Sequence, residues 1–509
     1  MKLSELLYPN EYTSVHSTDD IDITEIVSDT SLLSPGCLFV CIRGTKHDTH
    51  QAIPYIARCG TSAIIVEKGC DICPCDVPIF TVNNTRATLA HLWNRFCGDV
   101  ASQFCFIGVT GTNGKTSTAY MTHTALVANG YCCGFIGTVQ CMINHEIFTP
   151  TLSALQYSRL STMTTPDPDI LYSILLQMKQ RGVTHIVMEV SSHALLFSKC
   201  APILFDIGLF TNLSPEHLDI HENMEAYLQA KMILFGQCKT GIVNIDDPYA
   251  RLIIERASCE MLTCSTQNEA CFSAIKIVEK GTMGVDYIFC SSQGRCALSL
   301  QTPGHFTIYN SLLAAAAALT AGASLSKIKK GLGELRGVKG RMERVNGEDI
   351  DFSVFIDYAH TEMAMRHLLT TVRSFCKKGE RIVALFGCGG DRDKTKREKM
   401  GACAAELADY SIITTDNCRT EDAKQIILDI LKGMPNPQRR KVIVSRAKAI
   451  EYAILHAQPN DVILLIGKGH EAYEIIGTKQ YDFDEREIVR QAIQKRKWLH
   501  NHKEGDYEG

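Results

Sequence analysis

The sequence predicts an α/β protein, because apolar segments of strand length alternate with longer helical segments along most of its 509 residues. A glycine-rich loop at 111–114 joins one strand to a helix, and a polar segment at 336–341 precedes a new series of strands and helices. A chain of this length holds about three domains by the usual domain size. We therefore expect domains at 1–100, 101–336 and 337–509, with a doubly wound, mostly parallel sheet in the central one.

The composition excludes several broad classes of protein. The formal net charge is −4 and the isoelectric point is about 6.5, so we expect no basic surface for nucleic acid or for a membrane. Hydrophobic residues make up 45% of the chain, which is enough for buried cores. The first residues contain no long apolar run, so we expect neither a signal peptide nor a transmembrane helix. The prediction is a cytoplasmic monomer.

The 22 cysteines are expected to be free thiols, because nothing in the sequence indicates secretion. Several lie in apolar runs, where cysteine acts as a small hydrophobic residue. Cys70, Cys73 and Cys75 could form half of a zinc site, but no second pair of matching spacing follows nearby. A turn with incidental thiols is the favoured interpretation of this cluster, and a metal site stays open.

Residues 1–100 have the pattern of a small α/β domain. Two polar loops, at 28–30 and 47–50, could contact a ligand, although plain surface loops have the same composition. Ser28 and Thr30 are the candidate contacts in the first loop. The expected strands and helices of this domain lie at 37–42, 53–59, 62–66 and 86–96.

The most specific motif is the loop that follows the apolar strand at 104–109 and opens a helix. Its glycines let backbone N–H groups approach phosphate oxygens, and the start of the helix adds partial positive charge. Lys115 would neutralise the outer phosphates, and Thr116 would bind Mg2+ through its hydroxyl. The match to the general pattern is imperfect, because its first glycine would fall on Val109. The predicted nucleotide-binding residues are Gly111, Thr112, Asn113, Gly114, Lys115, Thr116 and Ser117.

Polar residues also follow the other strands of the central domain. In doubly wound sheets the ligand lies at the carboxyl ends of the strands, so these residues are candidates for a site. The expected strands lie at 104–109, 132–138, 185–190, 205–211 and 241–245. The polar residues at their ends include Glu189, Ser191, Ser192, His193, Asn212, Glu216, His217, Asp219, Asn244, Asp246 and Asp247.

The last third of the chain shows the same feature. An alanine-rich helix is expected at 312–335, and a hinge at 336–341 follows it. Four apolar strands then end in charged or glycine-rich segments, which predicts a second ligand-binding edge. The polar stretch from Lys497 is expected to fray. The four strands lie at 354–356, 382–386, 411–413 and 462–466.

Several short motifs, each weak alone, are informative in combination. They lie at 111–117, 164–167, 188–195, 211–213, 216–219, 357–361, 390–394 and 467–471. In this order and spacing the chain resembles the Mur ligases over nearly its whole length. The resemblance implies three domains: one for the UDP end of a substrate, one ATPase, and one Rossmann-like domain that closes over the site.

The resemblance implies an ATP-dependent amide ligase of peptidoglycan synthesis. ATP would phosphorylate the free carboxylate of the D-glutamyl residue in UDP-N-acetylmuramoyl-L-alanyl-D-glutamate. An amine would then attack the acyl phosphate through a tetrahedral intermediate and release phosphate. Because carboxylate and triphosphate are both anionic, the site needs Lys115, Mg2+ and an arginine before the two can meet.

The resemblance also assigns roles that the bare sequence does not mark. Thr116 and Glu189 would hold one metal ion, and His217 with a carbamylated Lys231 would hold a second, since a carbamate offers Mg2+ an anionic oxygen. Without the resemblance, Lys231 is interpreted as a surface lysine and His217 as a structural histidine. The predicted catalytic set is Lys115, Glu189, His217 and the carbamylated Lys231. The residues implied for the base, phosphate and ribose of the nucleotide are Asn310, Arg341 and Asp357.

The incoming amino acid is predicted from Asp416, Asn417, Cys418 and Arg419. Members of the family that add diaminopimelate carry Asp-Asn-Pro-Arg at this motif. An arginine can form a two-pronged bond with the distal carboxylate of meso-diaminopimelate, whereas lysine has no such carboxylate. We therefore favour meso-diaminopimelate over L-lysine or another diamino acid. The resemblance adds Arg392, Gly467 and Glu471 to this pocket.

The sequence departs from the family pattern at several positions. Phe197 and Lys199 stand where glutamine and arginine usually contact the UDP-muramoyl-peptide, so one amide is lost and one cation is kept. The other departures are Lys339, Glu362, Met363 and Cys418. The residues implied for this UDP-linked substrate are Ser28, Thr30, Thr164, Thr165, Ser191, Phe197 and Lys199.

Four hypotheses follow from these motifs. The first is the cell-wall ligase, with a diverged ligase for a related carboxylate as a variant. The second is a folylpolyglutamate or cyanophycin-type ligase, against which the motifs at 164–167 and 416–419 argue. The third, a P-loop kinase or GTPase, leaves the hinge arginine and the third domain unexplained. The fourth is a non-catalytic nucleotide-binding protein, which would be expected to lack the metal ligands.

Overall fold

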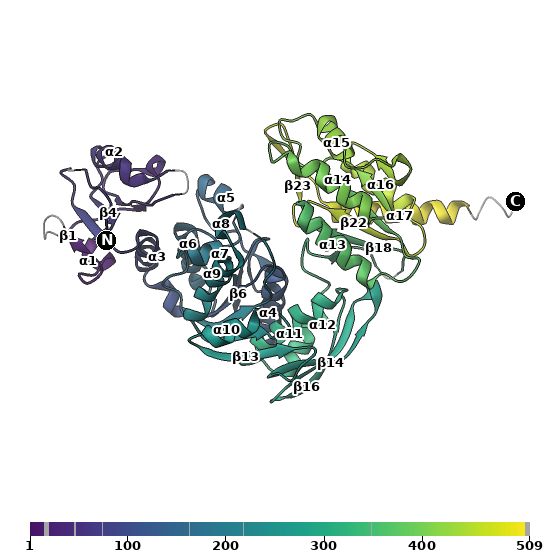
Figure 1. Ribbon diagram of the computed structural model, residues 1–509, viewed down its shortest axis with the longest axis horizontal. Coiled ribbons are helices and arrows are strands. Elements are labelled where there is room, and N and C mark those ends of the chain that lie inside the picture. The colour runs from purple at the N-terminus through teal and green to yellow at the C-terminus, as the bar shows by residue number, and fades with distance from the viewer. Residues whose placement is uncertain are drawn as a thin grey trace. The chain divides into compact units, whose positions relative to one another are not determined.

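The computed structural model describes residues 1–14, 20–44, 47–73, 75–161, 163–216, 218–347 and 349–503 (Figure 1). The chain folds into two compact units, Met1–Phe272 with Leu313–Ile328 and Ser273–Leu312 with Lys329–Gly509. The first unit contains a small N-terminal sheet and a larger central sheet, and the second contains an antiparallel ribbon and a C-terminal sheet. The predicted α/β class is confirmed.

The N-terminal sheet has the order β1-β5-β4-β3-β2 and is parallel except for β1. The inner strands β3 and β4 are buried on both faces. Leu38 and Val40 pack into one hydrophobic cluster, and Phe39 packs into another, because alternate residues of a strand point to opposite faces. The elements are α1 (Leu3–Leu6), β1 (Thr13–Ser14), β2 (Ile26–Val27), β3 (Leu38–Val40), α2 (Ile53–Arg58), β4 (Ala63–Glu67), β5 (Ile79–Val82) and α3 (Thr85–Phe96).

The central sheet is mixed. Its parallel strands run in the order β13-β12-β11-β6-β10-β7, and β8 and β9 add an antiparallel edge beyond β7. The parallel strands are β6 (Cys105–Thr110), β7 (Cys133–Ile136), β10 (His185–Glu189), β11 (Phe205–Phe210), β12 (Cys238–Asn244) and β13 (Glu260–Ser265). The edge strands are β8 (Cys141–Ile143) and β9 (Glu146–Ile147). The expected parallel strands are therefore confirmed, and the edge hairpin is new.

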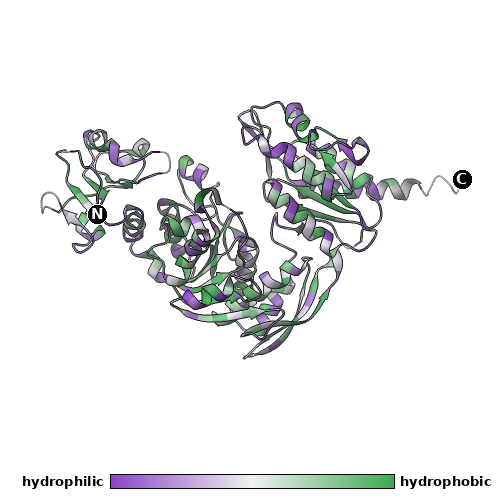
Figure 2. Ribbon diagram, viewed as in Figure 1, coloured by the Kyte–Doolittle hydropathy of each residue, from purple (hydrophilic) through white to green (hydrophobic). Residues whose placement is uncertain are grey.

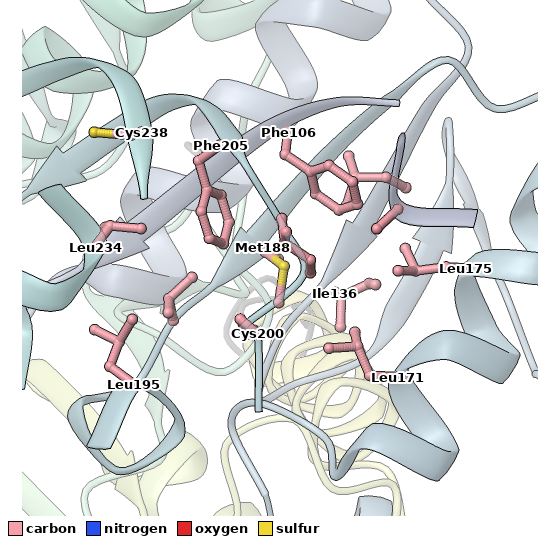
Figure 3. Packing of buried hydrophobic residues seen from close by; sticks show 14 of the residues in the cluster. Phe106, Ile136, Leu171, Leu175, Met188, Leu195, Cys200, Phe205, Leu234 and Cys238 are labelled. Carbon is pink, nitrogen blue, oxygen red and sulfur yellow. The ribbon is translucent and has the colours of Figure 1, made fainter. Parts of the chain in front are cut away.

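Helices cover the central sheet and bury its apolar side chains. Figure 3 shows Phe106, Met188 and Phe205 projecting from neighbouring strands into one cluster, which Leu234 joins. The rings of Phe106 and Phe205 meet edge to face with centroids 6.0 Å apart. The helices are α4 (Lys115–Asn129), α5 (Ala154–Leu160), α6 (Pro168–Gln180), α7 (Ser192–Leu196), α8 (Leu218–His221), α9 (Met224–Gly236) and α10 (Ala250–Arg256).

The second unit begins with an antiparallel ribbon that the sequence analysis did not predict. The strands are β14 (Phe272–Glu279), β15 (Val285–Ser291) and β16 (Gly294–Leu300). The helix expected at 312–335 is wrong in its bounds, since two helices occupy this region, α11 (His305–Thr320) and α12 (Leu325–Gly333). Gly322 adopts φ +95° between them, and a residue in this left-handed conformation ends a helix.

The C-terminal sheet has the order β17-β18-β22-β19-β20-β21 and is parallel except for β17. Figure 2 shows its strands as strongly hydrophobic, with mixed hydropathy on the helices around them. The strands are β17 (Glu343–Arg344), β18 (Ser353–Asp357), β19 (Ile382–Phe386), β20 (Tyr410–Ile413), β21 (Arg440–Val442) and β22 (Val462–Ile466). The helices are α13 (Glu362–Phe375), α14 (Thr395–Leu407), α15 (Ala423–Leu431), α16 (Arg446–Leu455) and α17 (Glu485–Lys503), and a hairpin is formed by β23 (Tyr473–Ile476) and β24 (Lys479–Asp482).

The structure also bears on the cysteines, on the C-terminal stretch and on the apolar character of the helices. All 22 cysteines are free thiols. The stretch from Lys497, expected to fray, is helical as far as Lys503, because α17 continues through it. Among the described residues, none of the helices combines the length and the apolar character needed to cross a bilayer.

Candidate active site

The glycine-rich loop connects β6 to the 15-residue helix α4 in the first unit. Gly111 adopts φ +145°, and a Cβ placed there would lie 1.9 Å from the Thr211 hydroxyl oxygen at the end of β11. Thr211 Oγ1 donates to the Asn113 carbonyl at 2.7 Å, and the Asn113 N–H donates to Asn212 Oδ1 at 3.0 Å. The neighbouring strand end therefore holds the loop in the shape that presents backbone N–H groups at the start of α4.

Two lysines converge on the carbonyls of this loop. Lys115 Nζ donates to Gly111 O at 2.9 Å and to Thr112 O at 2.7 Å. Lys231 Nζ, on α9, donates to the same Gly111 O at 2.8 Å, and the Lys231 side chain is only 1% exposed. Burial, and then the charge of Lys115, holds the pKa of Lys231 well below that of an ordinary lysine. A lowered pKa increases the neutral amine, which is the form that can react with carbon dioxide.

Glu189, at the end of β10, is the centre of a group of oxygen atoms. Thr116 Oγ1 donates to Glu189 Oε2 at 2.9 Å, and the backbone N–H of Thr138 donates to Glu189 Oε1 at 2.8 Å. The hydroxyl of Thr138 donates to Glu189 Oε2 at 3.2 Å, and it lies 3.1 Å from the hydroxyl of Thr164. A buried carboxylate among hydroxyls is the hard-oxygen environment that Mg2+ prefers, so the residues present fit this ion.

The second predicted metal position is only partly described. His217 lies outside the described residues. Lys231 lies beside the loop, and it would offer a metal ion an anionic oxygen only as its carbamate. Within the described ranges, no three His, Cys, Asp or Glu side chains gather as a metal cluster. Cys70, Cys73 and Cys75 are free thiols in this structure.

The residues predicted for the UDP-linked substrate fall into two groups. Thr164, Thr165 and Ser191 lie around β10, where Thr165 Oγ1 donates to Glu189 O at 2.9 Å. Ser28, Phe197 and Lys199 instead line a cavity of about 380 Å³. Thr30 begins a short 3-10 helix, Thr30–Leu32, next to the lining residue Asp29.

The residues predicted for the rest of the nucleotide lie in the second unit. Asn310 is buried in α11. Asp357, at the end of β18, accepts from the backbone N–H groups of Met342 and Ala359, both at 2.9 Å. Burial raises the pKa of Asp357, while the charge of Arg341 opposes the rise. The Nε of Arg341 is buried without a hydrogen-bond partner among the described residues, so this guanidinium has a donor to spare for a ligand.

Arg419 is held by its own backbone and by a glycine loop. It adopts φ +50°, its N–H donates to Ile475 O at 3.1 Å, and its Nη1 donates to Gly390 O at 2.9 Å. A Cβ on Gly389 would lie 3.1 Å from Arg419 Nη1 and 3.9 Å from Arg392 Cγ, so the two arginines flank this glycine. In the described part of the chain neither arginine forms an ion pair with a carboxylate of the protein.

A buried polar network lies beside Arg419. Asn417 Nδ2 donates to Glu471 Oε2 at 2.8 Å, and Lys468 Nζ donates to Asn417 Oδ1 at 3.0 Å. Lys468 also lies 3.8 Å from Asp416 and 3.6 Å from Glu471. Burial would raise the pKa of Asp416, but the charges of Lys468 and Arg446 hold it below its ordinary value. Burial and the Asp416 charge raise the pKa of Glu471.

Sequence reasoning missed two residues of these groups. Lys468 is fully buried at the centre of the polar network, and Thr138 contacts Glu189 through both its N–H and its hydroxyl. A Gly-Lys-Gly sequence directly after an apolar strand was the available signal for Lys468. Cys418 lies in the hydrophobic core of the sheet, and Gly467 donates its N–H to Asp357 O at 3.0 Å.

Comparison with known proteins agrees with this geometry. The Mur ligase middle domain matches residues 109–318, and the Mur ligase glutamate ligase domain matches residues 340–469. The UDP-N-acetylmuramoyl-L-alanyl-D-glutamate--2,6-diaminopimelate ligase of Bacillus licheniformis is 38% identical over 505 residues, covering 97% of this chain and 99% of that protein. The solved structure of such a ligase has a TM-score of 0.68 at 28% identity and covers 97% of this chain and 99% of the other.

A more distant structure shares the fold. Mycobacterium tuberculosis folylpolyglutamate synthase complexed with ADP has a TM-score of 0.58 at 18% identity and covers 76% of this chain and 92% of the other. The strand, glycine loop and helix, the three sheets and the matched length define a nucleotide-using ligase of the P-loop type. The chain belongs to the Mur ligase family. Its full-length relatives carry the name of ligases for 2,6-diaminopimelate.

Proposed function

We propose that this protein is an ATP-dependent ligase that adds meso-diaminopimelate to UDP-N-acetylmuramoyl-L-alanyl-D-glutamate in peptidoglycan synthesis. The observation that carries the choice of amino acid is Arg419, whose guanidinium lies beside Arg392 without a carboxylate partner in the described part of the chain. A guanidinium of this kind fits the distal carboxylate of diaminopimelate. The similarity to diaminopimelate ligases over 97% of the chain supports the same choice.

The proposal gives each part of the chain a task. Residues 1–100 would hold the UDP end of the substrate, 101–336 would hold ATP, and 337–509 would hold the amino acid. Thr116 and Glu189 would hold Mg2+, which would neutralise phosphate charge when bound. The substrates are metabolites of the cytoplasm, which is where we place the reaction.

The reaction follows from the chemistry of these groups. The loop at 111–117 and Lys115 bind the triphosphate, so that an oxygen of the D-glutamyl carboxylate attacks the γ-phosphorus and ADP leaves. The amine of diaminopimelate then attacks the acyl carbon, the tetrahedral intermediate collapses, and phosphate leaves with one carboxylate oxygen. The amine loses a proton as the amide forms. One ATP is converted to ADP and phosphate for each amide bond.

The test is phosphate release that depends on the amino acid. The purified protein receives ATP, Mg2+ and the UDP-linked dipeptide, with meso-diaminopimelate, L-lysine or L-ornithine in parallel. Release only with diaminopimelate supports the proposal. Release with L-lysine would support a ligase activity but overturn the role of Arg419 in choosing the amino acid. No release with any of the three amines would overturn the assignment of the UDP-linked dipeptide as the substrate.

A further inference from the structure

The cavity of about 380 Å³ in the first unit contains more charge than the predicted substrate residues account for. Its lining includes three cationic side chains, Arg86, Arg159 and Lys199, and four carboxylates, Glu25, Asp29, Asp167 and Asp169. Arg86 lies in the first turn of α3, and Lys199 follows α7. A cavity with cations at its wall is suited to an anionic ligand, provided that the protein does not already neutralise those cations.

Two of the three cations are neutralised within the cavity wall. Lys199 Nζ lies 2.8 Å from Asp167 Oδ1. Arg159 pairs with Asp167 at 3.3 Å and also with Asp169. These pairs leave little positive charge for a ligand, since each cation already faces a carboxylate.

Arg86 differs from both. It is half-buried and, in the part of the chain that the structure describes, it forms no ion pair. Glu67 and Asp167 act on it only through longer-range charge, and the Glu67 carboxylate already accepts from the backbone N–H and the hydroxyl of Thr85. Burial lowers the pKa of Arg86, yet a guanidinium stays protonated in proteins. A partly buried cation without a direct carboxylate partner among the described residues therefore lines the cavity.

Two contacts fix the position of this guanidinium. Arg86 Nη2 donates to Arg43 O at 2.8 Å, and Arg86 Cζ lies 4.4 Å from the ring centroid of Phe197. A guanidinium over an aromatic face is attracted by the ring and keeps in-plane N–H donors for a planar or tetrahedral anion. The Phe197 ring thus holds the Arg86 guanidinium by a cation–π contact. The glutamine that is usual at this position has no aromatic ring and could not make this contact.

We propose that Arg86, positioned by Phe197, is the residue that binds the anionic part of the UDP-linked substrate in this cavity. The ligand chemistry is a phosphate or carboxylate oxygen, which the diphosphate and the peptide of the substrate both supply. This inference rests on the proposed function, because it takes its ligand from it. It makes Arg86 a specificity-determining residue and Phe197 a positioning residue.

The first experiment measures the affinity of UDP and of UDP-N-acetylmuramoyl-L-alanyl-D-glutamate by calorimetry. Arg86→Gln is expected to weaken binding of the complete substrate roughly 10- to 100-fold, as the loss of a charge-assisted hydrogen bond does. Arg86→Lys keeps the charge and should lose less. Arg58→Gln removes an exposed arginine of α2 that does not line the cavity, so it should change nothing. If Arg86→Gln loses as much affinity for UDP as for the complete substrate, Arg86 binds the diphosphate. If it loses affinity only for the complete substrate, Arg86 binds the peptide carboxylate.

A double-mutant cycle tests the role of Phe197. Phe197→Leu removes the ring and is expected to weaken binding in the presence of Arg86, whereas Phe197→Tyr keeps the ring and should not. If Phe197 acts through Arg86, the double variant Arg86→Gln with Phe197→Leu will be no weaker than Arg86→Gln alone. If the fold-losses in affinity of the two single variants multiply in the double variant, Phe197 does not act by positioning Arg86.

The outcome that overturns the inference is distinct from the failure of the proposed function. If the wild-type protein joins the substrates but Arg86→Gln leaves the KM for the UDP-linked substrate unchanged, Arg86 does not bind it. If Arg86→Gln lowers only the melting temperature, or lowers kcat without changing this KM, the residue is structural. If the wild-type protein neither binds nor uses the UDP-linked substrate, it is the proposed function that fails.

Discussion

At the scale of single residues, the proposed chemistry depends on a lysine whose surroundings disfavour its charge. Lys231 is 1% exposed, its Nζ contacts Gly111 O, and burial lowers its pKa. Such an amine is suited to form a carbamate, which would give the site an anionic oxygen beside the nucleotide loop.

Replacing Lys231 by alanine is expected to lower kcat about 100-fold or more, because the site of phosphoryl transfer would lose the anionic carbamate oxygen that binds the metal ion. The wild-type rate should rise with added bicarbonate, and the variant should not respond. Lys239→Ala is the matched control, since Lys239 is exposed and pairs with Asp206 on the surface. A Lys231→Ala variant within twofold of the wild-type rate would rule out the carbamate.

The burial of Lys231 could have been anticipated from spacing. Tyr227, Leu228, Leu234 and Phe235 are buried on α9, and Lys231 falls on the same helical stripe. The role of Arg86 could not, because it depends on a contact between residues 111 positions apart in the sequence. His217 was assigned only through the resemblance, and it lies outside the described residues.

Arg419→Lys is expected to raise the KM for meso-diaminopimelate roughly 10- to 100-fold, because a lysine cannot make the two-pronged bond to a carboxylate. The KM for ATP should stay the same. Arg373→Lys, on the exposed face of α13 and paired with Asp409, provides the control. An unchanged KM for the amino acid would show that another group recognises its distal carboxylate.

At the scale of elements, the junction of β6 and α4 sets the nucleotide site. The apolar strand, the glycines and the following helix were all apparent in the sequence, because each has a strong local pattern. The closeness of Thr211 to Gly111 was not, since it comes from the pairing of β6 with β11.

Gly111→Ala is expected to abolish ATP binding while the protein still folds. The added Cβ would lie 1.9 Å from Thr211 Oγ1, so the loop must move. Gly130→Ala at the other end of α4 is the matched control, because it also has a positive φ of +99° but has open space around the Cβ. It should cost about 1 kcal/mol of stability and leave ATP binding intact. Normal ATP binding by Gly111→Ala, measured by calorimetry, would contradict the role of this contact.

The packing of α4 also predicts a pH dependence. His123 is buried against β7, its Nε2 lies 3.2 Å from Cys133 O, and burial lowers its pKa to about 4. Between this value and its ordinary pKa of 6.5 the unfolded chain binds more protons, so stability falls as the pH drops through that window. The contribution is roughly 3 kcal/mol. Glutamine cannot titrate, so the unfolding free energy of His123→Gln, measured in urea, should depend less on pH. The same slope of unfolding free energy against pH in variant and wild type would contradict this role of His123.

At the scale of the whole molecule, the sequence predicted the buried inner strands of the sheets but missed β5, the edge strands and the antiparallel ribbon. The parallel strands that were predicted in the central and C-terminal sheets are continuous apolar runs. The parallel strands β13 and β21 were missed because they are partly exposed. The ribbon β14–β16 was missed, although β15 alternates buried and partly buried residues and β16 begins at Gly294, directly after a turn. The division of the chain into domains at 1–100, 101–336 and 337–509 stays a prediction.

The proposed ligase joins ATP, a UDP-linked carboxylate and an amino acid through an acyl phosphate. The measurement that tests this most directly uses substrate whose D-glutamyl carboxylate carries oxygen-18, together with ATP, Mg2+ and meso-diaminopimelate. Mass spectrometry follows both the product and the released phosphate. We expect the tripeptide product, and phosphate that carries one labelled oxygen from the substrate. Unlabelled phosphate, or hydrolysis of ATP without the tripeptide, would contradict it.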